Sequence, residues 1–64
     1  MMICSITVLG KIDPARSSWF DGLEITAQET TTILTGQVAD QAALFGILNR
    51  IRDLGLALVD VKVS

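Results

Sequence analysis

The sequence has no histidine and no tyrosine, a single cysteine (Cys4) and a single proline (Pro14). One cysteine excludes an intrachain disulfide framework, and the lack of histidine leaves almost no way to build a zinc site. No apolar run approaches the roughly 20 residues that span a bilayer, and the apolar stretch Met1–Leu9 has neither a basic leader nor a small-residue cleavage site. We therefore expect a cytoplasmic protein with no metal, no cofactor and no membrane association.

Basic residues are few: five Lys and Arg stand against seven Asp and Glu, and the cations are scattered along the chain. Because a nucleic-acid binder needs clustered cations to meet the phosphate backbone, we expect no nucleic-acid partner.

Apolar residues, in contrast, make up 50% of the 64 residues. A domain of this size buries only about 60% of the surface that its unfolded chain exposes, so its core is marginal. Self-association is the remaining way to supplement that core. We expect one small domain, residues 1–64, that forms a homo-oligomer, most simply a dimer.

Local patterns in the first half of the chain predict a strand, a short helix and a β-hairpin. The alternation of apolar and polar residues in Ile3–Leu9 is typical of a half-buried strand. Asp13 followed by Pro14 predicts the start of a helix of two turns at most, ending near Gly22. Alternation within residues 23–38, interrupted by a polar turn, predicts the hairpin.

The second half of the chain predicts one long amphipathic helix and a closing strand. Asp40 is the expected N-cap and Gly55 the expected left-handed C-cap. Between them, the apolar residues fall on one stripe: Leu44, Ile47, Leu48, Ile51 and Leu54. In the strand over residues 56–63, three valines are expected to face the helix, with two charged residues facing away: Val59, Val61 and Val63, then Asp60 and Lys62.

This order of elements predicts an α+β domain of the ferredoxin-like (βαββαβ) kind with a reduced first helix. Its four-stranded, mainly antiparallel sheet would be covered on one face by one long helix. The connection from Gly10 to Gly22 is close to the minimum of about 10–12 residues for a crossover, so an alternative is the same sheet with residues 14–20 as a loop. Both leave the second face of the sheet open.

Residues that could carry chemistry have structural explanations. Cys4 lies on the apolar face of the first strand with no histidine to activate it, which indicates a buried structural thiol. Asp13 and Asp40 are accounted for by helix capping, and the loops have no pattern of clustered oxygen ligands for a cation. We expect no catalytic residue and no enzymatic activity.

Three residues on the long helix and two before it are candidate partner contacts: Phe45, Asn49 and Arg52, then Trp19 and Phe20. Phe45 lies off the apolar stripe, so it either contacts a partner or covers the edge of the sheet. Trp19 and Phe20 are adjacent and cannot both enter the core, and capping of the core by Trp19 is the alternative to a contact role.

The sheet face away from the long helix is expected to carry four aliphatic residues among serine, threonine and glutamine: Ile3, Leu9, Ile33 and Leu58. A solvated face does not need them, so they form the candidate oligomer face, through sheet-to-sheet or edge-to-edge contact.

Four segments together resemble a group of short, uncharacterised bacterial proteins: Trp19-Phe20-Asp21-Gly22-Leu23, the threonine-rich Thr32–Gly36, Asp40–Gly46 (DQAALFG) and Arg52–Leu56 (RDLGL). The resemblance covers most of the chain from Trp19 onward and marks a family without implying an activity. In that group a histidine often stands where this chain has Phe45, so an apolar contact is favoured at this position. The resemblance adds suspicion of a contact role for Arg52 and Asp53, which capping does not require.

Two functions are compatible with these observations. The first is a non-enzymatic, homo-oligomeric interaction or accessory module, with an unidentified protein as a possible further partner. The second is a small-molecule-sensing regulatory domain that binds an effector at a dimer seam, which rests on analogy with other ferredoxin-like domains.

Overall fold

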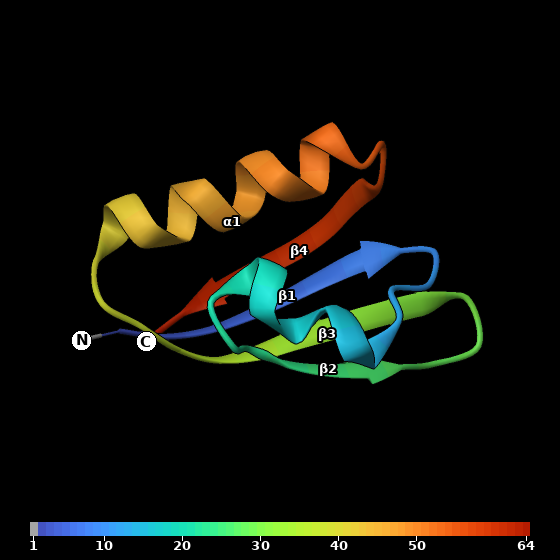
Figure 1. Cartoon of the computed structure of the whole chain (residues 1–64), viewed down its shortest axis with the longest axis horizontal. Helices are drawn as coiled ribbons and strands as arrows, with labels where there is room; N and C mark the ends of the chain where they lie inside the picture. Colours follow the sequence, from blue (N-terminus) through green and yellow to red (C-terminus); the bar gives the residue numbers. More distant parts are fainter. Residues whose placement is uncertain (1) are drawn as a thin grey trace.

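The computed structural model describes residues 2–64 and has two layers, a sheet and the helical segments that cover one of its faces (Figure 1). The elements in chain order are β1 (Met2–Leu9), the 3₁₀ helix η1 (Pro14–Phe20), β2 (Glu24–Ala27), β3 (Thr31–Val38), α1 (Gln41–Asp53) and β4 (Ala57–Val63). This confirms the predicted α+β class and the predicted order of elements.

The four strands form one sheet in the order β2-β3-β1-β4, and each neighbouring pair is antiparallel. Ile6 in the central strand β1 lies opposite Leu34 of β3 and Val61 of β4. It follows that β1 and β2 run in the same direction with β3 between them, and that β3 and β4 do so with β1 between them. The predicted four-stranded, mainly antiparallel sheet is confirmed.

Alternation along β1 determines which face of the sheet becomes the core. Cys4, Ile6 and Val8 are buried, with exposed fractions of at most 1%. Ser5 and Thr7 point to the other face, as the period-2 pattern predicts. The core between sheet and helices also includes residues from the loop after β1, from η1 and the turn after it, and from β2, β3 and α1: Ile12, Phe20, Leu23, Ile25, Leu34, Val38, Leu44, Ile47 and Ile51. β4 contributes the partly buried Val61.

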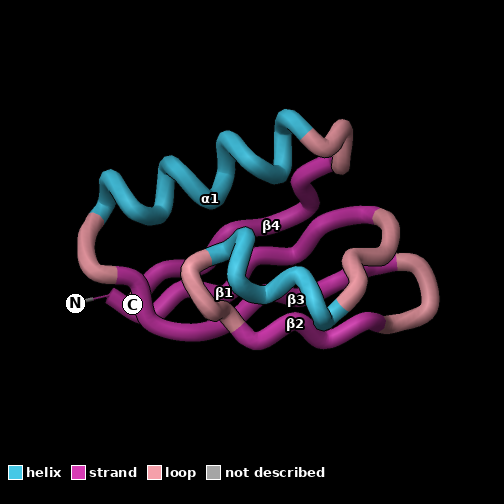
Figure 2. The backbone as a smooth tube through the Cα atoms, viewed as in Figure 1, coloured by secondary structure: helices cyan, strands magenta, loops and turns pink. Residues whose placement is uncertain are grey.

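The segment Pro14–Phe20 is a helix and not a loop, but it is a 3₁₀ helix. Asp13 caps it, since the side-chain Oδ1 of Asp13 accepts a hydrogen bond from the backbone N–H of Ala15 at 3.0 Å. Phe20, at its end, is completely buried beside Leu23. The expectation of a sheet covered by one long helix is therefore wrong, because η1 packs on β2 and on α1 and covers part of the same face (Figure 2).

The interpretation in which Trp19 caps the core is wrong, because Phe20 is the buried residue of this aromatic pair and Trp19 is the exposed one. Phe20 is 0% exposed and Trp19 is 42% exposed. The guanidinium of Arg16 lies 4.3 Å from the centre of the Trp19 ring, a cation–π contact on the outer side of η1. Phe20 is the last residue of η1 and is buried together with Leu23, just before β2 begins at Glu24.

Helix α1 begins and ends where the sequence predicts. The Oδ1 atom of Asp40 accepts a hydrogen bond from the Ala43 N–H at 2.9 Å, and Gly55 has the left-handed φ of 75° that stops the helix. Leu44, Ile47 and Ile51 are buried, with Leu48 partly so. Leu54, expected to complete this stripe, is 45% exposed because it already lies beyond the last helical turn.

Strand β4 differs from the prediction because it contains a β-bulge. Thr7 lies opposite Asp60, but the next residue, Val8, lies opposite Leu58, so Val59 is an extra residue. Residues that lie opposite each other share a face of the sheet, which places Leu58 on the helix side with buried Val8. The assignment of Leu58 to the open face is therefore wrong, and of the three valines expected to pack under the helix only Val61 is half-buried against the core.

Candidate interaction surface

The flank of α1 that faces β4 is exposed and partly apolar. Phe45 is 53% exposed, and Arg52, two turns further on, is exposed on the same flank. Asn49 lies between them and is exposed as well. The structure thus brings together the three helix residues that were predicted as partner contacts.

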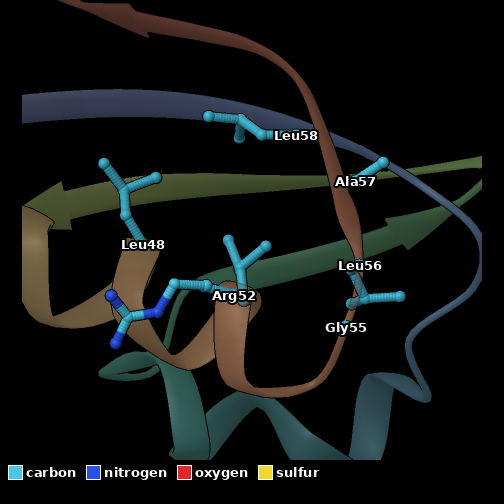
Figure 3. Close-up of a pocket in the computed structure, with 7 residues that line it drawn as sticks. Leu48, Arg52, Gly55, Leu56, Ala57 and Leu58 are labelled. Atoms are coloured by element: carbon cyan, nitrogen blue, oxygen red, sulfur yellow. The ribbon is translucent and has the colours of Figure 1, made fainter.

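A hollow of about 420 Å³ lies between this flank and the start of β4 (Figure 3). It is lined by Leu48, Ile51, Arg52, Gly55, Leu56, Ala57 and Leu58. Figure 3 shows Leu48 and Arg52 reaching from the helix, with Leu58 on the strand opposite them. Arg52 is the one charged side chain among these lining residues, and its Nη2 is 3.5 Å from the exposed carboxylate of Asp53.

The outer edge of β4 continues this apolar surface. Leu58 is 50% exposed, Val59 58% and Val63 46%. β4 pairs with β1 on one side, and no strand within residues 2–64 pairs with its other side. We use the name β4-side surface for these three residues together with Phe45 and Leu48.

The open face of the sheet is less continuous than predicted. Ile3 and Leu9 are exposed there, with Ile33 partly buried, but Ile3 and Leu9 stand at opposite ends of β1. At about 3.4 Å per residue their Cα atoms are roughly 20 Å apart. The positions between and beside them carry hydroxyl groups: Ser5, Thr7, Thr26 and Thr35.

A second hollow, of about 260 Å³, adjoins η1. Its lining includes Trp19, Arg16 and Lys11 with an apolar part from Leu54 and Leu56. Trp19 is thus accessible, and its contact role stays a prediction, whereas Phe20 is not accessible. The prediction of Phe20 as a partner contact is wrong because its side chain is completely buried.

The one thiol of the chain is unsuited to nucleophilic chemistry. Cys4 is 1% exposed, and burial raises the pKa of its thiol, which lowers the fraction of reactive thiolate. Two carboxylates, Asp13 and Asp40, accept backbone hydrogen bonds at helix starts. Among residues 2–64, no three Cys, Asp or Glu side chains gather where they could hold a metal ion.

Sequence reasoning missed two residues of the β4-side surface, Val59 and Val63, because alternation alone assigned them to the core. The predicted number of helices could have indicated that part of the sheet is exposed. One helix about 10 Å wide cannot cover the full width of four strands about 4.8 Å apart, so the last strand of the chain was a candidate for an uncovered edge.

These features define a small α+β domain with a four-stranded antiparallel sheet, two helical segments on one face and an exposed apolar surface along α1 and β4. No helix in the described part of the chain is both long and apolar enough to cross a membrane. The chain belongs to the family described as Domain of unknown function (DUF8691), whose family model matches residues 3–62. Comparison with curated proteins and with solved structures found no match.

Proposed function

We propose that this protein is a non-enzymatic, cytoplasmic interaction module that associates with itself, most simply as a dimer, through the β4-side surface. The observation that carries the proposal is the apolar exposure of Phe45, Leu58, Val59 and Val63 on one side of the molecule. The single cysteine, kept as a free thiol, is typical of a reducing compartment.

Energetics favour burial of this surface. Within residues 2–64 the core has twelve buried apolar residues, and so small a core leaves little stability in reserve. Removing apolar side chains from water stabilises by about 25 cal/mol per Å². A second copy that covers the β4-side surface would therefore stabilise the fold as well as the complex.

The fold proposed with this function is a reduced ferredoxin-like βαββαβ plan. Its support is the connectivity: η1 follows β1 and leads to the parallel strand β2, while α1 follows β3 and leads to the parallel strand β4. In each unit one strand of the other unit lies between the two parallel strands, which is the split βαβ arrangement.

Analytical ultracentrifugation at micromolar concentration tests the proposal. We expect a dimer for the wild type and a monomer for Val59→Asp, because a carboxylate would be buried in the interface. Leu9→Asp is the matched control, since Leu9 is about as exposed but lies on the open face. A 6.9 kDa monomer for the wild type, or a dimer that Leu9→Asp disrupts and Val59→Asp does not, would overturn the proposal.

The hollow beside α1 supports a second candidate function, the sensing of a small molecule. Its volume of about 420 Å³ and its apolar lining with one cation, Arg52, suit a short apolar carboxylate. The hollow adjoins the β4 edge, so an effector there would lie at the seam of the proposed dimer.

A thermal-shift experiment with 4-methylpentanoate, and with the uncharged 4-methylpentanamide as control, tests this second function. A ligand at 100 times its dissociation constant adds about 2.7 kcal/mol of stability. We expect stabilisation by the carboxylate alone and its loss in Arg52→Gln. Equal behaviour of the two compounds, or no shift with either, would contradict the sensor function.

A further inference from the structure

In the regular part of β4 that follows the bulge, the backbone presents its hydrogen-bonding groups to the outer edge at Val61 and Val63. Ser64 and Ile3 exchange both backbone hydrogen bonds, at 2.9 and 3.2 Å, so Ser64 points its polar groups toward β1. Because orientation alternates along an antiparallel strand, Lys62 and Asp60 point their backbone groups inward too, while Val63 and Val61 point theirs outward.

We propose that two copies of the chain join through their β4 edges, antiparallel, with Val61 on the two-fold axis, to form one continuous sheet. This inference rests on the proposed function and names its partner, a second copy of this chain. In this register Val61 lies opposite the partner's Val61, and Val63 lies beside the bulged part of the partner's strand at Val59. The exposed valines of both strands are then buried together.

Charge selects this register over its neighbours. Residues whose backbone groups point outward must lie opposite partner residues of the same orientation. The two-fold axis therefore passes through a residue of β4 and never between two residues. An axis at residue 60 would place two Asp60 carboxylates opposite each other, and an axis at residue 62 would do the same with two Lys62 ammonium groups. Like charges directly opposite are destabilising. With the axis at Val61, Asp60 lies opposite the partner's Lys62, twice per dimer.

Within one chain, Asp60 and Lys62 already lie where the pairing with the partner's Lys62 and Asp60 requires them. Asp60 and Lys62 share the open face, since they lie opposite Thr7 and Ser5 of β1. The Nζ of Lys62 is 4.0 Å from the Oδ2 of Asp60, and both side chains are exposed. In the dimer each carboxylate would lie between its own lysine and the partner's Lys62, giving four charges of alternating sign around the axis.

The opposite edge of the sheet is a poorer candidate. β2 has only four residues, against seven in β4, and it begins with the exposed Glu24. Short edge strands with charged residues resist pairing with another chain. β4 is longer, and its two charged residues, Asp60 and Lys62, have opposite signs, so they attract rather than repel each other in the antiparallel register.

Charge reversal tests the register. Asp60→Lys would place a lysine opposite the partner's Lys62, and Lys62→Asp would place two carboxylates opposite each other. We expect each single variant to raise the dimer dissociation constant at least about tenfold. The double variant Asp60→Lys/Lys62→Asp restores both pairs and keeps the net charge of −2, so we expect wild-type affinity. An equimolar mixture of the two single variants should form the heterodimer, detected by native mass spectrometry.

Glu24→Lys is the control, because it makes the same change of charge on the opposite edge strand, and it should leave the dissociation constant unchanged. Rescue by the double variant distinguishes a changed interface from a variant that does not fold. A wild-type dimer that is insensitive to all of these reversals, or single variants that the double variant does not rescue, would overturn the register while leaving the proposed dimer in place. A wild-type monomer would overturn both.

Discussion

The side-chain hydroxyl of Thr32 donates a hydrogen bond of 2.7 Å to the backbone carbonyl of Gly10. The same oxygen accepts a hydrogen bond of 3.1 Å from the backbone N–H of Ile12. Thr32 is completely buried in β3, whereas Gly10 and Ile12 belong to the loop that follows β1. One hydroxyl therefore fixes the start of the crossover that leads to η1.

Replacing Thr32 by valine should destabilise the fold by about 1–3 kcal/mol, because the carbonyl of Gly10 and the N–H of Ile12 lose their partner in a buried place. Thr32→Ser keeps the hydroxyl and should lose less, about the value of one buried methyl group. Urea unfolding followed by circular dichroism measures both. If serine proves as destabilising as valine, packing and not the hydrogen bonds holds the loop.

Phe20→Ala should lower the free energy of unfolding by about 3–5 kcal/mol, because it leaves a cavity at a completely buried site. A domain this small can unfold as a result. Trp19→Ala should lower the free energy of unfolding by about 1 kcal/mol or less, mostly because it removes the cation–π contact with Arg16. Thermal melts of the two variants provide the comparison. Greater sensitivity to the loss of Trp19 than of Phe20 would contradict the inward orientation of Phe20.

Gly36→Ala should destabilise by about 1–3 kcal/mol. Gly36 has a φ of 152°, and a Cβ placed on it would lie 2.9 Å from Cδ2 of Leu23, whose side chain packs over β3. Gly46→Ala is the matched substitution in α1, where an added Cβ meets nothing within 4 Å. It should stabilise by roughly 0.5–1 kcal/mol, so opposite signs in chemical denaturation are the expected result.

Alkaline pH should weaken the fold through Cys4. Burial raises the pKa of this thiol, so the unfolded state loses the proton first as the pH increases. The stabilising contribution is complete below the unfolded pKa of about 8.5 and is lost as the pH rises from there through the folded pKa. Urea unfolding at pH 7 and pH 10 should show a larger loss for the wild type than for Cys4→Ala. Equal losses would mean that other groups account for the pH dependence.

Sequence patterns predicted the parts of the fold that depend on local chemistry. Asp40 and Gly55 mark the ends of α1 because capping satisfies backbone groups within a few residues. Alternation in β1 identified Cys4, Ile6 and Val8 as core because successive side chains of a strand point to opposite faces. Neither feature requires knowledge of the partner strands.

The features that sequence patterns missed depend on contacts between distant segments. The bulge at Val59 exists only relative to β1, so the alternation of β4 alone could not show it. The choice between Trp19 and Phe20 depends on how η1 docks on β2. The candidate site divides in the same way: Phe45 and Arg52 followed from their place on the helix, whereas exposure of Val59 and Val63 depends on the width of the sheet.

The mutual hydrogen bonds between Ile3 and Ser64 place the start of β1 beside the end of β4 (Figure 1). A linker of a few residues could therefore join Ser64 to residue 2 and close the backbone into a ring. The turn between β2 and β3, where residues 28–30 are exposed, offers a place to open that ring again. A circularly permuted chain begun there would keep every strand pairing while changing the order in which the strands are synthesised.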